Sequence, residues 1–364
     1  MSLLSRSPSR EAAPQQAETA GHAPQPRGKA PRRHSGPLPD RGHALRYWII
    51  MAVLMLCAVG FTFGILAWDN PMEVGSRGFW LIARMRVETV IVVAVVALCQ
   101  AMATVAFQTA TNNRIITPSI MGFESLYVAV QTAMVFLFGI TGVSMLIGVP
   151  QFFLQAGAMV VFAMILYTWL LSGRFSNIHI MLLVGVVIGG GLGSLSTFMQ
   201  RMLTPSEFDV LTARFFGNIG NARTEYLPYV IPIVLIVGTV LWLRASRLNV
   251  VALGKNTANN LGLNHKRELM VILGLVSVLM AMTTSLVGPM TFLGFLVATL
   301  AYTLADTYSH RMLFPMAALI GYVVLTGAYF VMRHIFYAQG AVTIIVELVG
   351  GLVFLFFILR KGRL

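Results

Sequence analysis

The pattern nearest to catalytic chemistry in this chain is the pair Gly254-Lys255 followed by Asn256. A Walker A loop needs a glycine five residues before its Gly-Lys pair and Ser or Thr after it, to surround phosphates and ligate Mg²⁺. Asn249 and Asn256 occupy those two positions. We therefore expect no nucleotide site in the chain, and any ATP hydrolysis must come from a partner.

The seven histidines do not form a metal-binding pattern, because no pair has the spacing of a helical ligand site. They lie in an N-terminal tail and at separate loops, at His22, His34, His43, His179, His265, His310 and His334. We expect no metal or haem held by this chain.

Two acidic residues fall in or beside apolar stretches. Glu347 lies in the last one, where a carboxyl is either hydrogen-bonded inside the bundle or takes part in transport, and both readings stay open. Glu124 is expected to start a helix, where a carboxylate complements the helix dipole.

The composition indicates a membrane protein. Of the 364 residues, 57% are hydrophobic and 11% are charged, and the mean hydropathy is +0.78. Soluble domains have about 45–50% apolar and about 25% charged residues, so the surplus apolar surface must face lipid. This excludes an ordinary soluble enzyme, a disordered scaffold and a coiled coil. The net charge of +13 does not indicate nucleic acid, because the basic residues are scattered.

Ten apolar stretches separated by short polar breaks predict an all-α polytopic membrane protein of about ten transmembrane helices. The expected spans are Leu45–Trp68, Val87–Phe107, Ser125–Ile147, Phe152–Leu171, Ile178–Met202, Tyr226–Trp242, Leu269–Val287, Phe292–Leu304, Leu313–Met332 and Val342–Leu359. The eighth is short, which predicts a tilted or partly irregular span. Spanning β-strands are not expected, because the runs are continuously apolar rather than alternating.

The distribution of basic residues predicts the orientation. Ten spans put both ends on one side, and placing the ends inside leaves 19 of the 26 Lys and Arg on inner segments. Basic loops stay in the cytoplasm, so both ends are predicted to be cytoplasmic. Residues 1–44 hold seven of the 15 prolines and almost no large apolar residue, which predicts a disordered basic tail before a transmembrane domain over 45–364.

Two polar segments are too specific for plain loops. The first runs from Gln108 to Gly122, includes Asn113 and Pro118, and joins the second span to the third. Asn and Pro break helices, and glycine permits a close backbone approach. The second, Val250–Leu263, is a short amphipathic stretch in the most basic internal loop.

Both segments resemble parts of the permease subunits of iron-chelate and cobalamin ABC importers. The stretch TNNRIITPSIMGFESLY (111–127) is similar to the family's Q…NPLA-P-LLG segment, in the form found in the branch that imports ferric siderophores. ALGKNTANNLGLN (252–264) resembles the family's ALGEETARSLGLN coupling segment, with Lys255 in place of an acid. GPMTFLGF (288–295) resembles GPIGFVGL, and Arg86 fits the first arginine of RLPR.

The resemblance implies a type II ABC importer permease that moves a ferric siderophore across the bacterial cytoplasmic (inner) membrane. It implies an ABC ATPase dimer holding ATP and Mg²⁺, a periplasmic substrate-binding protein, and a second permease subunit that is more often different than identical. The chain itself is expected to be no enzyme and to bind no cofactor. The ATPase is expected to contact Val250, Val251, Leu253, Gly254, Thr257, Ala258, Leu261 and Gly262.

The resemblance also implies that outer arginines meet acidic residues of the binding protein, with snorkelling at headgroups as the alternative. These arginines are Arg77, Arg84, Arg86 and Arg333. A further set lines the translocation path or lets helices pack closely, and both readings are open. It comprises Gln108, Asn113, Pro118, Gly122, Gly189, Gly190, Gly193, Gly288, Pro289 and Gly294.

Two other functions remain as alternatives. An ABC importer of the same kind could carry cobalamin or haem instead. The contacts to the cargo come from a wide cavity, so the sequence does not identify the cargo. An ion-coupled secondary transporter is the alternative from another class, although no convincing internal repeat is found.

Overall fold

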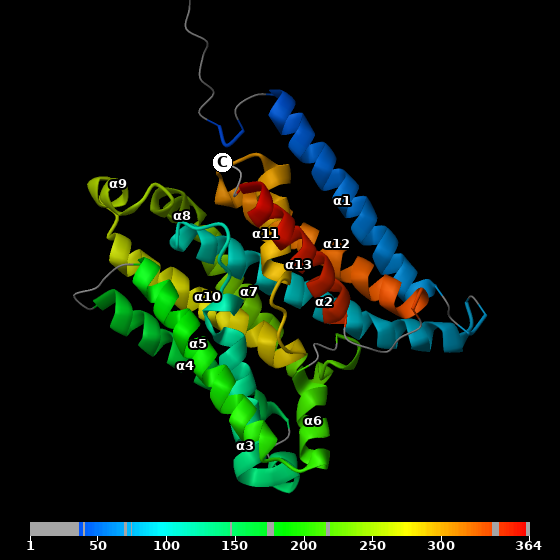
Figure 1. Ribbon diagram of the computed structural model, residues 1–364. Coiled ribbons are helices and arrows are strands. Elements are labelled where there is room, and N and C mark those ends of the chain that lie inside the picture. The colour runs from blue at the N-terminus through cyan, green and yellow to red at the C-terminus, as the bar shows by residue number, and fades with distance from the viewer. Residues whose placement is uncertain are drawn as a thin grey trace, which may run out of the picture. The chain divides into compact units, whose positions relative to one another are not determined.

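The computed structural model describes residues 36–38, 41–68, 71–73, 75–145, 148–172, 178–215, 219–336 and 342–361, all within one unit of the chain, Gly36–Leu364. Every regular element in this described part is a helix (Figure 1). The α-helices are α1 (Arg41–Ala67), α2 (Arg77–Ala110), α3 (Phe123–Met145), α4 (Val149–Ser172), α5 (Ile178–Arg201), α6 (Pro205–Phe215), α7 (Leu227–Leu243), α8 (Ala245–Val251), α9 (Lys255–Asn260), α10 (His265–Val287), α11 (Leu293–Ala305), α12 (His310–His334) and α13 (Val342–Lys361). Three 3₁₀ turns join them, η1 (Ser119–Met121), η2 (Ile219–Asn221) and η3 (Thr224–Tyr226).

The ten predicted spans correspond to ten of these helices. Seven are long and apolar enough to cross a bilayer, and three shorter apolar helices cover Phe123–Gly139, Leu293–Ala305 and Val342–Phe356. The expected short eighth span is α11, which has 13 residues and follows an irregular segment. The all-helical transmembrane prediction is therefore confirmed.

Most predicted boundaries differ from the structure by a few residues, and the largest difference is at the start of α2. α2 has 34 residues and begins at Arg77, ten residues before the predicted Val87, because charged residues in its first turns do not stop a helix capped by Ser76. α1 begins at Arg41, inside the predicted tail, so the helix extends one turn beyond its apolar run. The rest of the tail prediction, residues 1–35, 39 and 40, lies outside the described residues.

Helix α6 is a feature that the sequence analysis missed. The start of α6 is capped by Thr204 and Glu207. The backbone N–H and the hydroxyl of Thr204 both donate to Oε2 of Glu207, at 2.9 and 2.8 Å. These hydrogen bonds hold the pKa of Glu207 below its ordinary value. Leu211 then packs against Met134 and Val135 of α3. The sequence signal was a Thr-x-x-Glu pattern before an amphipathic turn.

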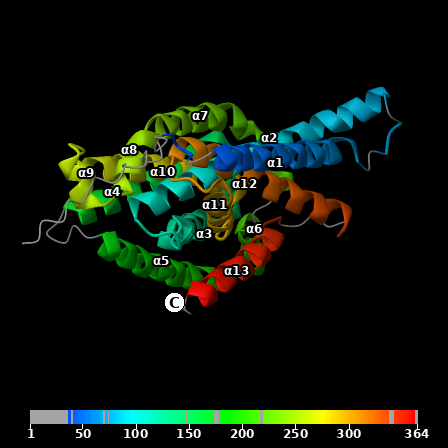
Figure 2. The ribbon, with the colours of Figure 1, turned by 90° about the horizontal axis from the view of Figure 1, so that it is seen from above.

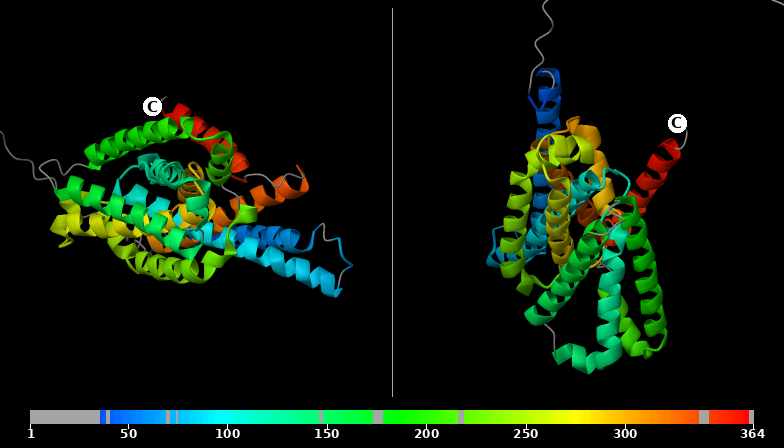
Figure 3. Two further views of the ribbon diagram at one scale, coloured as in Figure 1. Left: turned by 90° about the horizontal axis from the view of Figure 1, so that it is seen from below. Right: turned by 90° about the vertical axis from the view of Figure 1, so that its left-hand side faces the viewer.

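The helix ends sort onto two sides of the bundle. On one side, the hydroxyl of Tyr47 in α1 donates to the carbonyl of Met312 in α12 at 2.9 Å. On the same side, the backbone N–H of His310 donates to Oδ1 of Asn249 in α8 at 3.1 Å. Figures 1 and 3 show the end of α13 directed toward the same side as the start of α1, although the two ends lie apart. Both ends of the described membrane region therefore share the side that carries α8 and α9.

Helix α2 forms the centre of the bundle, where it packs against α10 and α12. In its most apolar stretch 78% of the residues are buried, against 11% for α1, which lies on the outside. Figures 2 and 3 show α5 and α13 at one face of the unit, with α3 behind them.

The glycines of α5 divide into two groups. Gly189 packs against Gly122, and a Cβ on Gly189 would lie 2.9 Å from the Cα of Gly122. At Gly190 and Gly193, apart from the neighbouring backbone of α5 itself, no atom of the described residues lies within 4 Å of the place that a Cβ would occupy, and both glycines lie on the open side of α5. Close packing is therefore the role of Gly189, whereas Gly190 and Gly193 leave an open face.

We expect Gly189→Ala to destabilise the purified chain in detergent by about 1–3 kcal/mol, because backbone atoms of Gly122 block the new methyl group. Gly190→Ala is the matched control, with open space at the same helix and the same chemical change. The apparent melting temperature of the two variants measures this difference. Equal melting temperatures would show that the contact between α3 and α5 adapts without cost.

Candidate functional site

The segment expected to meet the ATPase folds as two short helices, α8 and α9, rather than one amphipathic stretch. Gly254 separates them with φ +88°, and Gly262 follows α9 with φ +80°. Side chains rarely adopt positive φ, so glycine at both positions allows the chain to turn sharply before and after α9. Ala258 anchors α9 and is fully buried, and its N–H donates to the carbonyl of Gly254 at 3.0 Å.

Helix α8 is tied to α10 by ion pairs. Nη1 of Arg244 lies 2.6 Å from Oε1 of Glu268, and Nη1 of Arg247 lies 3.3 Å from Oε2 of the same carboxylate. Glu268 is 5% exposed, so both arginines close over a nearly buried charge. Leu248 and Val251 add apolar contacts, because both are buried beneath α8.

A second connection runs from α8 to α12 and α2. Oδ1 of Asn249 accepts from the backbone N–H of His310 and lies 2.6 Å from its Nδ1. Nε2 of the same ring lies 2.7 Å from Oγ1 of Thr109 in α2. Because the amide oxygen accepts, this network assigns the ring proton to Nδ1. Side chains therefore join α8 directly to α10 and α12, and the His310 ring extends this connection to α2.

The predicted contact residues fall on both sides of the segment. Val251 and Ala258 point inward and hold α8 and α9 in place. Leu253 and Leu261 are 58% and 62% exposed although they are large and apolar. Thr257 and Gly262 are also exposed, and Val250 and Gly254 are half-buried. The surface offered to a partner is thus two leucines on a polar, basic background.

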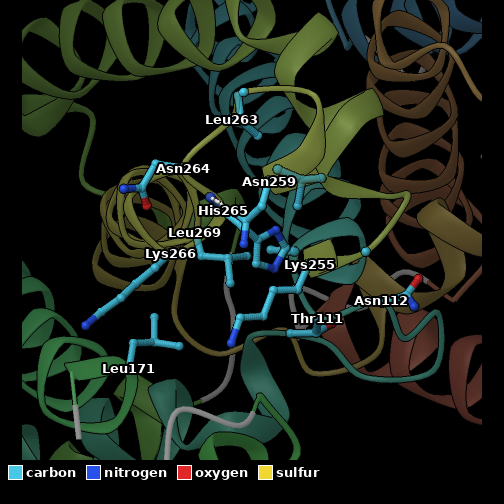
Figure 4. A pocket seen from close by; sticks show the side chains of 14 residues that line it. Thr111, Asn112, Leu171, Lys255, Asn259, Leu263, Asn264, His265, Lys266 and Leu269 are labelled. Atoms are coloured by element: carbon cyan, nitrogen blue, oxygen red, sulfur yellow. Dashed lines mark hydrogen bonds between the residues drawn. The ribbon is translucent and has the colours of Figure 1, made fainter. Parts of the chain in front are cut away.

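Beside α9 lies a cavity of about 730 Å³ (Figure 4). The end of α2, the end of α4, α9 and the start of α10 line it, through residues that include Asn112, Leu171, Lys255 and His265. Figure 4 shows Lys255 and Lys266 among the side chains that line it, with Leu269 between them. α9 therefore shares this cavity with the ends of α2 and α4 and the start of α10.

The residues predicted for the path or for packing between α2 and α3 shape a turn. Nε2 of Gln108 donates to the carbonyl of Arg114 at 2.7 Å, and Oδ1 of Asn113 accepts from the N–H of Ile115 at 2.9 Å. Pro118 precedes η1, and Gly122 ends it with φ +94° before α3 begins.

A side chain of α3 stabilises the Gly288-Pro289 break between α10 and α11. The N–H of Met290 donates to Oε1 of Glu124 at 3.1 Å, and the hydroxyl of Thr291 donates to Oε2 at 2.6 Å. Glu124 therefore satisfies a loop as well as starting its own helix. Gly288 ends α10 with φ +98°.

Gly294 follows this break at the start of α11. It faces Thr104 of α2 so closely that a Cβ there would collide with it. Gly294 is therefore a packing residue. Glu347 is half-buried on α13.

The four outer arginines do not share one environment. Arg86 is 6% exposed, and its Nη1 donates to the carbonyls of Ile65 at 3.1 Å and Trp68 at 2.7 Å. In this buried position Arg86 caps the end of α1, which distinguishes it from the other three arginines predicted to dock a binding protein. Arg77, Arg84 and Arg333 are exposed.

Two outer arginines that the motifs did not single out line a second cavity. Arg214 of α6 and Arg223 before η3 border a space of about 280 Å³ among α3, α4, α6 and α10. Nothing in their sequence spacing marks them.

Comparison with known proteins identifies the family. Residues 48–360 match the FecCD transport family. The petrobactin import system permease protein FatC of Bacillus anthracis is 46% identical over 325 residues, which cover 89% of this chain and 92% of that protein. The petrobactin import system permease protein YclO of Bacillus subtilis (strain 168) is 35% identical over 263 residues, covering 72% of this chain and 84% of that protein.

A solved structure shows the same fold. It is an inward-facing conformation of a metal-chelate type ABC transporter, with a TM-score of 0.72 and 19% identity, covering 86% of this chain and 99% of that one. The match over most of the helical region confirms the type II importer permease fold and the predicted resemblance. The chain belongs to the FecCD transport family and is a membrane permease of that family.

Proposed function

We propose that this chain is the membrane-spanning permease of an ABC importer that carries a ferric siderophore, with petrobactin as the first candidate, across the cytoplasmic membrane of a bacterium. The observation that carries the proposal is the 46% identity to FatC over 89% of the chain. Relatives named for other cargoes, ferric enterobactin and cobalamin, are each 27% identical. Family membership removes an ion-coupled secondary transporter as the alternative.

A different second permease completes the path in this proposal. FatC and FatD of Bacillus anthracis are both named petrobactin import system permease proteins, and this chain is 46% identical to FatC and 24% identical to FatD. That difference favours a heterodimer in which this chain takes the FatC position. The open face of α5, with Gly190 and Gly193, lets another chain or the cargo come close.

The ATPase docks on α8 and α9 and supplies ATP hydrolysis, with ATP and Mg²⁺ held by that partner. Leu253 and Leu261 provide an apolar anchor of the kind that dominates protein interfaces. The ion pairs to Glu268 and the contact between Asn249 and His310 make α8 move together with α10 and α12. A displacement of the ATPase therefore reaches the helices that enclose the path. In this orientation both ends of the chain are cytoplasmic.

The opposite, periplasmic side receives a substrate-binding protein. The exposed side chains of Arg77, Arg84 and Arg333 present positive charges on this side, to which acidic residues of a partner are attracted. Arg86 lies buried beside this surface and stabilises the end of α1 by donating a hydrogen bond to the carbonyl of Trp68.

The cargo assignment is tested with the importer reconstituted from this chain, its partner permease and its ATPase. We expect ATP-dependent uptake of radiolabelled ferric petrobactin, and at least tenfold less uptake of cobalamin, because the identity to petrobactin permeases exceeds that to a cobalamin permease. An importer that moves cobalamin and ignores ferric petrobactin would contradict the assignment.

We expect Leu261→Asp to reduce both ATPase co-purification and uptake by about tenfold or more, since it buries a charge in the apolar anchor. Tyr308→Asp is the control, because Tyr308 is 85% exposed on the same side of the bundle but outside α8 and α9. Pull-down from gently solubilised membranes measures the first effect. A Leu261→Asp chain that retains its ATPase would remove α9 from the interface.

Reversing two exposed charges, Arg84→Glu with Arg333→Glu, is expected to weaken docking of the binding protein. The loss should be larger at low salt than at high salt, because salt screens exposed charges. Surface plasmon resonance at two salt concentrations measures it. Arg201→Glu, a change of the same charge at another exposed outer arginine, is the control. An equal loss at both salt concentrations would argue against electrostatic docking at Arg84 and Arg333.

A further inference from the structure

The cavity between α3, α4 and α6 has a wall of hydrogen-bond donors. Its volume is about 280 Å³, and the described residues lining it include Gln131, Gln151, Gln155, Arg214 and Arg223. The three glutamines are nearly buried, at 5%, 6% and 3% exposed. Amides are costly to bury unless they have hydrogen-bond partners, so their arrangement is informative.

Arg214 fixes the direction of the hydrogen bonds in this wall. A guanidinium can only donate, so Oε1 of Gln131 must be the atom that accepts from Nη1 of Arg214 at 3.2 Å. Nε2 of Gln131 then donates to Oε1 of Gln155 at 2.7 Å. Nε2 of Gln155 is consequently a buried donor that makes no hydrogen bond of standard geometry within 3.5 Å in the described part of the chain, although the Gln155 amide also interacts with the hydroxyl of Tyr127, which lines the same cavity. The hydroxyl of Ser285, at the end of α10, lines the same cavity and likewise has no hydrogen-bond partner in the described part of the chain.

The charge at the cavity is positive and incompletely neutralised. Among the described side chains, no carboxylate lies within 4.0 Å of the Arg214 guanidinium. Nη1 of Arg223 reaches only Oε1 of the exposed Glu225 at 4.0 Å and donates to the hydroxyl of Tyr226 at 3.1 Å. Burial and the neighbouring Arg223 both lower the pKa of Arg214. Two cations thus lie near each other beside a buried amide N–H that makes no hydrogen bond of standard geometry in the described part of the chain.

We propose that this cavity binds a carboxylate group, which accepts hydrogen bonds from Arg214 and from Nε2 of Gln155. A carboxylate has acceptors only, fits the planar donor fork of arginine, and supplies the negative charge that this wall lacks. The size of the cavity suits one small organic acid or one carboxylate arm of a larger molecule. The proposal concerns a site outside the α8–α9 segment and does not depend on which cargo the importer carries.

The test is a titration of the importer complex in lipid nanodiscs with succinate at low ionic strength, followed by calorimetry. We expect saturable binding by the unchanged complex. Arg214→Gln should weaken it by about tenfold or more, because a charge-assisted hydrogen bond is lost. Arg201→Gln removes an exposed charge at the end of α5 and should leave binding unchanged. Absence of succinate binding, or equal loss in both arginine variants, would overturn the proposal.

Gln155→Glu provides a variant that keeps the local fold. Its carboxylate can still accept the hydrogen bond from Gln131, but it replaces the buried N–H donor with a negative charge. Succinate binding should be lost while the melting temperature of the complex is maintained. Retained binding in this variant would overturn the assignment of Gln155.

Competition identifies the source of the carboxylate. If the ferric chelate displaces succinate, the group on the transported molecule occupies the site. If the chelate has no effect, a free small acid is the occupant. Both outcomes support a carboxylate site, and uptake assays of the cargo report separately on the proposed transport function.

Discussion

Backbone hydrogen bonding without water is the constraint on which the rest of this structure depends. Inside a bilayer each N–H and carbonyl needs a partner from the protein, so the spans are helices and every break needs polar side chains. Gln108 and Asn113 supply them after α2. Glu124 supplies them to the loop before α11. The family's polar motifs thus lie where helical hydrogen bonds stop.

The same need to satisfy polar groups explains how the α8–α9 segment is held. Glu268 and His310 are nearly buried, and each is committed to α8 through Arg244, Arg247 or Asn249. Removing one partner would leave a buried polar group unsatisfied, which costs more than the net value of the hydrogen bond. These contacts therefore favour movement of α8, α10 and α12 as one body. The exposed side chains of Leu253 and Leu261 allow the segment to contact a partner by burying apolar surface.

Much of this arrangement could be predicted from the sequence, and the failures have physical causes. The ten spans follow from runs of apolar residues, whose length the bilayer fixes. Helix α6 was missed because it is short and partly polar, although its Thr-x-x-Glu cap was visible. Arg86 was predicted to dock a binding protein from the family resemblance, and its burial could not be read from the sequence. The carbonyls at the end of α1 lack helical partners and accept hydrogen bonds from the guanidinium, which allows Arg86 to be buried.

By itself, the sequence determined the membrane environment, the number of spans, the polar breaks and the family resemblance, because these depend on local composition and order along the chain. The tertiary structure decided which faces of the helices are buried. α1 and α2 are similarly apolar, yet 11% of one stretch and 78% of the other are buried. Gly189 packs while the adjacent Gly190 stays open. Hydropathy cannot separate such cases, because lipid and a protein interior are both apolar surroundings, and only contacts between distant segments distinguish them.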